Sequence, residues 1–104
     1  MAPSSQDIQR IVDMLVKEFA PQQVVLFGSR ANGTAPPESD VDLMVVLPFE
    51  GSAISVMLEK VYCMMDQPFA VEVHLRRPLA AGCEPDAVMR DAISRGRVLY
   101  RAAA

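Results

Sequence analysis

The chain has 104 residues, of which 51% are apolar and 22% are charged, and its formal net charge is −3. This length is typical of one domain with one hydrophobic core, and the composition is typical of a globular rather than a disordered protein. The acidic balance argues against a nucleic-acid binder that works through a broad basic surface. A nucleotide-binding protein remains possible, because one local positive patch or one metal ion is enough to hold a nucleotide.

The sequence shows no pattern typical of a secreted, membrane or zinc-binding protein. Its two cysteines, Cys63 and Cys83, lie twenty positions apart and are accompanied by one histidine, His74, so disulfide and zinc frameworks are poor interpretations. The first ten residues, MAPSSQDIQR, lack the basic and apolar regions of a signal peptide. No apolar run approaches the roughly 18–20 residues of a membrane span. We therefore expect a soluble cytoplasmic protein.

The N-terminal part of the chain predicts one helix followed by one strand. Apolar residues at spacings of three and four predict an amphipathic helix over residues 4–19. These residues are Ile8, Ile11, Val12, Leu15, Val16 and Phe19. Ser4 and Asp7 resemble a capping box in which Asp replaces the usual Glu, and Pro21 ends the helix. The β-branched run QVVLF predicts a strand over residues 23–27.

The middle of the chain predicts a second strand and a second long helix. After the turn-prone segment 28–39, the sequence DVDLMVVL predicts a strand over residues 40–47. Beyond Asp40 and Asp42 both faces of this strand are apolar, so we expect it to be central in a sheet and covered on both sides. Apolar residues at helical spacing then predict a helix over residues 54–65.

The C-terminal part predicts a third strand, a helix and an edge strand. FAVEVHL predicts a strand over residues 69–75. A helix is expected over residues 85–93, with Pro85 in its first turn and Gly96 closing it, and RVLY predicts a short edge strand over residues 97–100. The fold class is therefore α/β (α+β): a small mixed β-sheet with helices packed on it, in which periodicity leaves the direction of the strands open.

Two aspartates that open the second strand are candidate metal ligands. Asp40 and Asp42 are two positions apart on a strand, so their side chains point to one face with Cβ atoms about 6–7 Å apart. Such a pair can reach a common hard cation, and Mg²⁺ in nucleotide enzymes is usually held by one or two carboxylates with phosphate oxygens. Two ions need a third carboxylate from a neighbouring strand. Glu72, within the third strand, is the strand-borne candidate.

The Gly-Ser turn before this strand is a candidate phosphate-binding segment. Gly28 lets a phosphate approach the backbone closely, Ser29 adds a hydroxyl donor, and Arg30 offers a fixed positive charge. Taken separately, a Gly-Ser turn or an Asp-x-Asp pair is usually structural. Together with Glu72 between two apolar residues, they predict a site for a metal-bound nucleoside triphosphate. His74 shares a strand face with Glu72, although a lone histidine near a strand end is more often structural.

At this point the sequence resembles a known family. The stretch GSRANGTAPPESDVDLMVV, residues 28–46, resembles the Gly-Ser-x10-Asp-x-Asp signature of the DNA polymerase beta-like nucleotidyltransferase superfamily. It is most similar to the minimal nucleotidyltransferases, or MNT proteins, and the likeness covers about residues 22–100. The resemblance implies the nucleotidyltransferase fold, a single domain over residues 1–104, and a catalytic core over residues 22–100.

The resemblance also implies an activity and a partner. Many MNT proteins act as the antitoxin of a HEPN/MNT toxin–antitoxin pair, transferring AMP from ATP, with two Mg²⁺ ions, to a tyrosine hydroxyl of the HEPN toxin. Gly28, Ser29 and Arg30 would then bind the nucleotide. Asp40, Asp42 and Glu72 would be the metal ligands and catalytic residues, with Glu72 helping to deprotonate the acceptor. The family usually has Asp at the position of Glu72. The longer side chain of Glu72 can still reach a metal, but its geometry for deprotonating the acceptor differs.

Two other functions are compatible with the sequence. One is nucleotide transfer to a small molecule such as an aminoglycoside, although the chain is short for an acceptor pocket of its own. The other is a non-catalytic antitoxin that neutralises its partner by binding alone. The presence of Asp40 and Asp42 argues against the non-catalytic antitoxin without excluding it.

Overall fold

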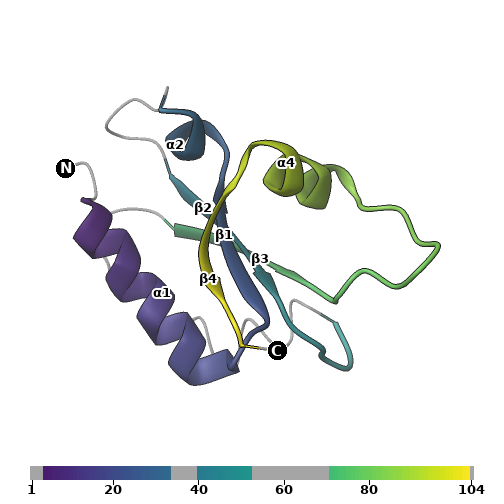
Figure 1. Ribbon diagram of the computed structural model, residues 1–104. Coiled ribbons are helices and arrows are strands. Elements are labelled where there is room, and N and C mark those ends of the chain that lie inside the picture. The colour runs from purple at the N-terminus through teal and green to yellow at the C-terminus, as the bar shows by residue number, and fades with distance from the viewer. Residues whose placement is uncertain (1–3, 34–39, 53–70, 104) are drawn as a thin grey trace.

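The computed structural model describes residues 4–33, 40–52 and 71–103, which form a four-stranded sheet with helices on its two faces (Figure 1). The elements in chain order are α1 (Ser5–Phe19), β1 (Gln23–Phe27), α2 (Ser29–Asn32), β2 (Val41–Val46), β3 (Val71–Arg76), α4 (Ala87–Arg95) and β4 (Arg97–Arg101). This arrangement confirms the predicted small mixed sheet with helices packed on it.

The sheet has the strand order β3-β2-β1-β4. β1 runs antiparallel to both β2 and β4, whereas β2 and β3 are parallel. β2 is therefore a central strand, as its two apolar faces predicted, and β4 is an edge strand. The sheet brings the C-terminal end of β1 beside the N-terminal ends of β2 and β3, so the segments that carry the candidate site residues meet at one edge.

α1 confirms the helix predicted from the N-terminal periodicity. The Ser4 hydroxyl accepts a hydrogen bond from the backbone N–H of Asp7, and the Asp7 carboxylate accepts one from the backbone N–H of Ser4. This reciprocal pair is the capping box that the sequence predicted. The apolar stripe of the helix packs on one face of the sheet, where Leu15 and Val12 are fully buried.

Two hydrophobic layers cover the two faces of the sheet. α1 covers the face that carries alternate residues of β1 and β2, such as Leu26 and Leu43. α4 lies on the opposite face (Figure 1), where Met89 and Ala92 pack with residues of the other alternation, including Phe27 and Met44. Asp42 belongs to the second alternation, so it lies on the α4 side of the sheet.

The start of α4 differs from the prediction. The predicted helix placed Pro85 in its first turn, but the helix begins at Ala87 and Pro85 precedes the cap. Asp86 is the N-cap, and its carboxylate accepts a hydrogen bond from the backbone N–H of Met89. That bond satisfies a free donor of the first turn, which is why the acidic residue rather than the proline sets the boundary.

Gly96 ends α4, as predicted, but for a different reason. Its φ is −77°, so it does not adopt the left-handed conformation usual for a terminal glycine. A Cβ at this position would instead lie 2.6 Å from Val25 Cγ1 and would also meet the Ala92 carbonyl oxygen. Glycine is required here because the turn from α4 into β4 passes directly against β1.

Some predicted elements lie outside the described residues. The helix expected over residues 54–65 is one, and the first two positions of the strand expected over residues 69–75 are another.

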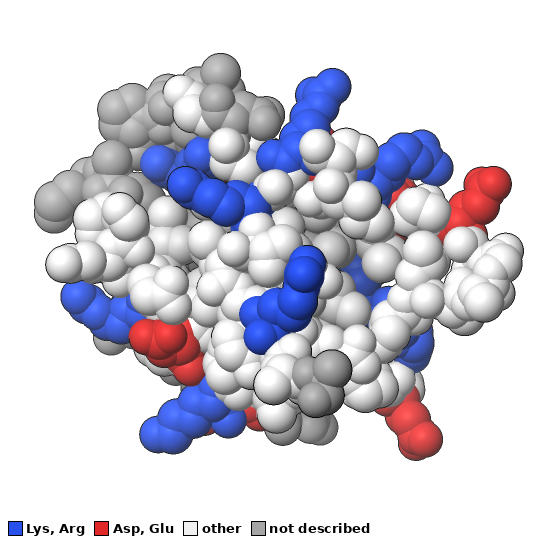
Figure 2. Space-filling view, in the orientation of Figure 1, with Lys and Arg blue, Asp and Glu red and all other residues white. Residues whose placement is uncertain are grey.

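Within the described part of the chain, no helix is long and apolar enough to cross a membrane. On the face seen in Figure 2, the basic side chains lie in separate groups rather than in one continuous patch.

Candidate active site

The Gly-Ser segment forms the turn between β1 and α2. β1 ends at Phe27, Gly28 takes a left-handed φ of +78°, and α2 begins at Ser29. The backbone N–H of Ala31 donates a hydrogen bond to the carbonyl oxygen of Gly28, which closes the turn. A residue with a side chain is disfavoured at this φ. The sharp change of direction therefore depends on glycine. Arg30 is half-buried within α2, and the Ser29 side chain lies outside what the structure describes.

Asp42 and Glu72 face each other across the parallel pair of β2 and β3. They are paired residues in the strand register, as are Met44 and His74 one step further along. Because side chains alternate along each strand, these four side chains share the α4 face of the sheet. Glu72 therefore lies on the strand next to Asp42, and its role as a third ligand stays a prediction.

His74 completes a group of three side chains that could hold a metal ion. One ligand atom from each of Asp42, Glu72 and His74 lies within 4.8 Å of the others. His74 Nε2 is 3.9 Å from Glu72 Oε1. The imidazole also makes an edge contact with the Phe27 ring, with 5.2 Å between the ring centroids. The histidine is three-quarters buried whereas the Glu72 side chain is 60% exposed, so the group opens to solvent on the Glu72 side.

The pKa of the Asp42 carboxyl is shifted by its surroundings. Partial burial raises the pKa of its carboxyl above the ordinary value of 3.8, and the neighbouring carboxyl of Glu72 raises it further. Asp40 adds a smaller increase, whereas His74 acts in the opposite direction. Two carboxylates in adjacent register positions repel each other. A cation placed between them would remove that repulsion.

Gly28 forms a cradle for Asp42. A Cβ built on Gly28 would lie 2.7 Å from Asp42 Oδ2, so the Asp42 carboxylate would have to move to admit it. The sequence predicted that glycine would leave room for a phosphate at this position. In the structure, the atom nearest to the space that a side chain would fill is the Asp42 carboxylate oxygen Oδ2. The turn and the carboxylate therefore lie side by side, which brings together the two halves of the predicted site.

The remaining predicted ligand lies just outside this group. Asp40 precedes the first residue of β2, is exposed, and is not one of the three clustered side chains. His74 takes the third place instead. The sequence placed His74 on one strand face with Glu72, but a structural role was favoured for it. The contact with Phe27, which fixes the ring, depends on the antiparallel pairing of β1 and β2 and left no signal in the sequence.

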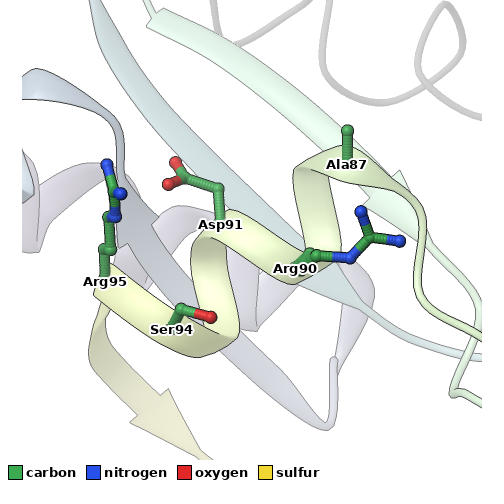
Figure 3. A pocket seen from close by; sticks show the side chains of 5 residues that line it. All are labelled: Ala87, Arg90, Asp91, Ser94 and Arg95. Atoms are coloured by element: carbon green, nitrogen blue, oxygen red, sulfur yellow. The ribbon is translucent and has the colours of Figure 1, made fainter.

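A pocket lies away from these residues, on α4 (Figure 3). It is an open pocket of about 370 Å³, and the described residues that line it occupy one side of the helix: Ala87, Arg90, Asp91, Ser94 and Arg95. Arg90 and Arg95 lie toward opposite ends of the row. The pocket includes no member of the Asp42 group.

The comparison with protein families decides the class of this chain. The sequence profile of the nucleotidyltransferase domain matches residues 8–99, which is most of its length. The chain belongs to the nucleotidyltransferase domain family. The matched region spans all six predicted site residues. Membership in this family supports a transferase activity. Among curated proteins, none matches the chain.

Solved structures share the nucleotidyltransferase fold. A toxin-antitoxin with AMP-PNP is similar with a TM-score of 0.63 and 20% identity, over 89% of this chain and 72% of that one. A mutant of the toxin-antitoxin MntA-HpeT has a TM-score of 0.62 and 18% identity, over 89% of this chain and 72% of that one. A nucleotidyltransferase described as putative, from Sulfolobus solfataricus, has a TM-score of 0.59 and 18% identity, over 90% of this chain and 77% of that one. At these identities the likeness concerns the fold.

Proposed function

We propose that this nucleotidyltransferase domain transfers AMP from ATP, with Mg²⁺, to a tyrosine hydroxyl of a HEPN-domain toxin and thereby acts as its antitoxin. The observation that carries the proposal is that Asp42 and Glu72 are paired between β2 and β3. Asp42 also lies beside Gly28, which follows β1. The similar structures include toxin-antitoxin complexes, one of them with AMP-PNP. The motif over residues 28–46 resembles that of the MNT antitoxins.

The donor set fits the metal that this chemistry needs. Asp42 and Glu72 supply carboxylate oxygens from neighbouring strands, and Asp40 lies two positions before Asp42. Oxygen ligands of this kind suit Mg²⁺. Partial burial and the neighbouring Glu72 carboxyl raise the pKa of Asp42, and a bound cation would act in the opposite direction. Two ions at such a site lower the pKa of an attacking hydroxyl and stabilise the leaving pyrophosphate.

Each predicted residue then has a defined part in the transfer. The acceptor hydroxyl oxygen forms a bond to the α-phosphorus of ATP. The bond from that phosphorus to the bridging oxygen breaks, and pyrophosphate leaves with the electron pair. Glu72, more exposed than its neighbours, helps to take up the hydroxyl proton. Gly28, Ser29 and Arg30 bind the triphosphate, and Asp40 and Asp42 hold the metal ions. The whole chain, residues 1–104, acts as one domain.

The test is mass spectrometry of the purified HEPN-domain partner after incubation with this protein, ATP and Mg²⁺. We expect the partner to gain one or more AMP units, with release of an equal amount of pyrophosphate. Asp40→Ala/Asp42→Ala should abolish both. If the wild type transfers nothing while the double variant still neutralises the toxin, the protein is a binding antitoxin and the proposed enzyme function is wrong.

A further inference from the structure

The group formed by Asp42, Glu72 and His74 contains a nitrogen ligand that the MNT resemblance does not assign to the metal site. We propose that His74 is a metal ligand in this chain, and that the site binds a first-row transition-metal dication such as Mn²⁺ more tightly than Mg²⁺. The inference rests on the proposed function, because it concerns the metal of the same site.

The geometry suits a shared ion. Two donor atoms that each lie about 2.1 Å from one cation are separated by at most about 4.2 Å. Glu72 Oε1 and His74 Nε2 are already 3.9 Å apart. The Asp42 ligand atom lies within 4.8 Å of both, so modest rotations of the Asp42 and Glu72 side chains would bring all three donors to one ion.

The imidazole is held in place by its surroundings. Its ring makes an edge contact with Phe27 at 5.2 Å and an interplanar angle of 66°, and Phe27 is itself buried. Phe27 and His74 lie on opposite sides of β2, with Asp42 paired to Phe27 in the register. A ligand whose orientation is fixed by packing loses little conformational entropy when it binds a metal.

The ligand chemistry decides which ion the group prefers. Mg²⁺ takes oxygen ligands in a near-ideal octahedron and retains several waters. Imidazole nitrogen binds first-row transition metals better, and their affinity rises from Mn²⁺ toward Cu²⁺. Two carboxylates with one imidazole therefore favour Mn²⁺ or a later dication over Mg²⁺. The carboxylates of Asp42 and Glu72, which lie in paired register positions, also attract any dication by their negative charge.

The test uses the fact that the chain has one histidine. In untagged, metal-free, nitrogen-labelled protein, every imidazole resonance in an NMR spectrum belongs to His74. Adding Zn²⁺, a diamagnetic probe, should shift one ring nitrogen strongly. Calorimetry should then show that Mn²⁺ binds more tightly than Mg²⁺, and that His74→Phe weakens Mn²⁺ about tenfold or more while changing Mg²⁺ much less. Phe retains an aromatic ring against Phe27 but offers no ligand atom.

The outcomes separate this inference from the proposed function. If Zn²⁺ and Mn²⁺ bind, the ring nitrogens do not shift and His74→Phe binds Mn²⁺ as the wild type does, then His74 is a packing residue and the inference is wrong. The carboxylate site of the proposed function would stand in that case. If neither Mn²⁺ nor Mg²⁺ binds the wild type, with or without an ATP analogue, both proposals fail. The wild-type spectrum needs no variant, so misfolding of His74→Phe cannot obscure the result.

Discussion

Asp42 and Glu72 occupy paired positions on two parallel strands, so two carboxylates of like charge lie side by side on one face of the sheet. Their repulsion, together with partial burial, raises the pKa of Asp42. Like charges placed opposite each other destabilise a sheet. The arrangement therefore destabilises the metal-free fold, and a cation bound between the two carboxylates would remove their repulsion.

The first prediction concerns the stability of the metal-free protein. Asp42→Asn keeps the shape of the side chain and removes the repulsion with Glu72. We therefore expect it to increase the free energy of unfolding by about 0.2–1 kcal/mol in a chelating buffer, and to abolish the proposed AMP transfer. Urea unfolding followed by circular dichroism measures the difference. A variant that is less stable than the wild type without metal would show that the carboxylate is not repelled.

The second prediction is the pH dependence of that difference. The folded-state pKa of Asp42 is raised above 3.8, so the folded state holds this proton more tightly than the unfolded state. The wild type therefore loses stability as pH rises from about 3.8 through the raised pKa. The advantage of Asp42→Asn should be absent at the acidic end of this window and constant above it. Urea unfolding at a series of pH values checks the sign, and an advantage that grows toward low pH would contradict it.

The third prediction concerns the cradle at Gly28. Gly28→Ala imposes a side chain at φ +78° and places its Cβ 2.7 Å from Asp42 Oδ2. Gly82→Ala is a matched control, because Gly82 has φ +84° and nothing within 4 Å of the added carbon. Both variants should lose about 1–2 kcal/mol of stability through the backbone alone. Calorimetric titration should show that metal binding is lost in Gly28→Ala and retained in Gly82→Ala; equal metal affinity in the two would contradict the cradle.

The fourth prediction concerns the N-terminus of α4. Asp86 caps this helix through Met89 and also accepts a hydrogen bond from Arg76 Nε at 2.7 Å. Asp86→Ala should cost about 1 kcal/mol for the cap and up to about 1 kcal/mol for the partly exposed ion pair. Asp86→Ser keeps a capping oxygen, so it should lose only the second part. Thermal unfolding of the two variants separates the contributions, and equal losses would show that the cap contributes nothing.

Much of this fold was predictable because its signals are local. The capping box at Ser4 and the apolar run of β2 depend on neighbours along the chain, and Glu72 was found from its place within a strand. The parallel direction of β2 and β3 was not predictable, because alternation looks the same in either direction. The start of α4 was missed since both Pro85 and Asp86 suit a first turn, and only the bond to Met89 distinguishes them.

The candidate site shows the same division. The sequence placed Glu72 and His74 on one face, but the group with Asp42 requires the register between strands that are thirty residues apart. The contact between Gly28 and Asp42 likewise arises from pairing of β1 with β2. Contacts across a sheet depend on which strands pair, and no single segment of the chain contains that information.

The most direct test of the central claim is a crystal structure of the protein with Mn²⁺ and a non-hydrolysable ATP analogue. The account predicts an anomalous Mn²⁺ signal bound by Asp42 and Glu72, shared with phosphate oxygens of an analogue that lies against the turn at Gly28. A nucleotide bound elsewhere, or a metal signal that leaves both carboxylates without a ligand bond, would contradict it.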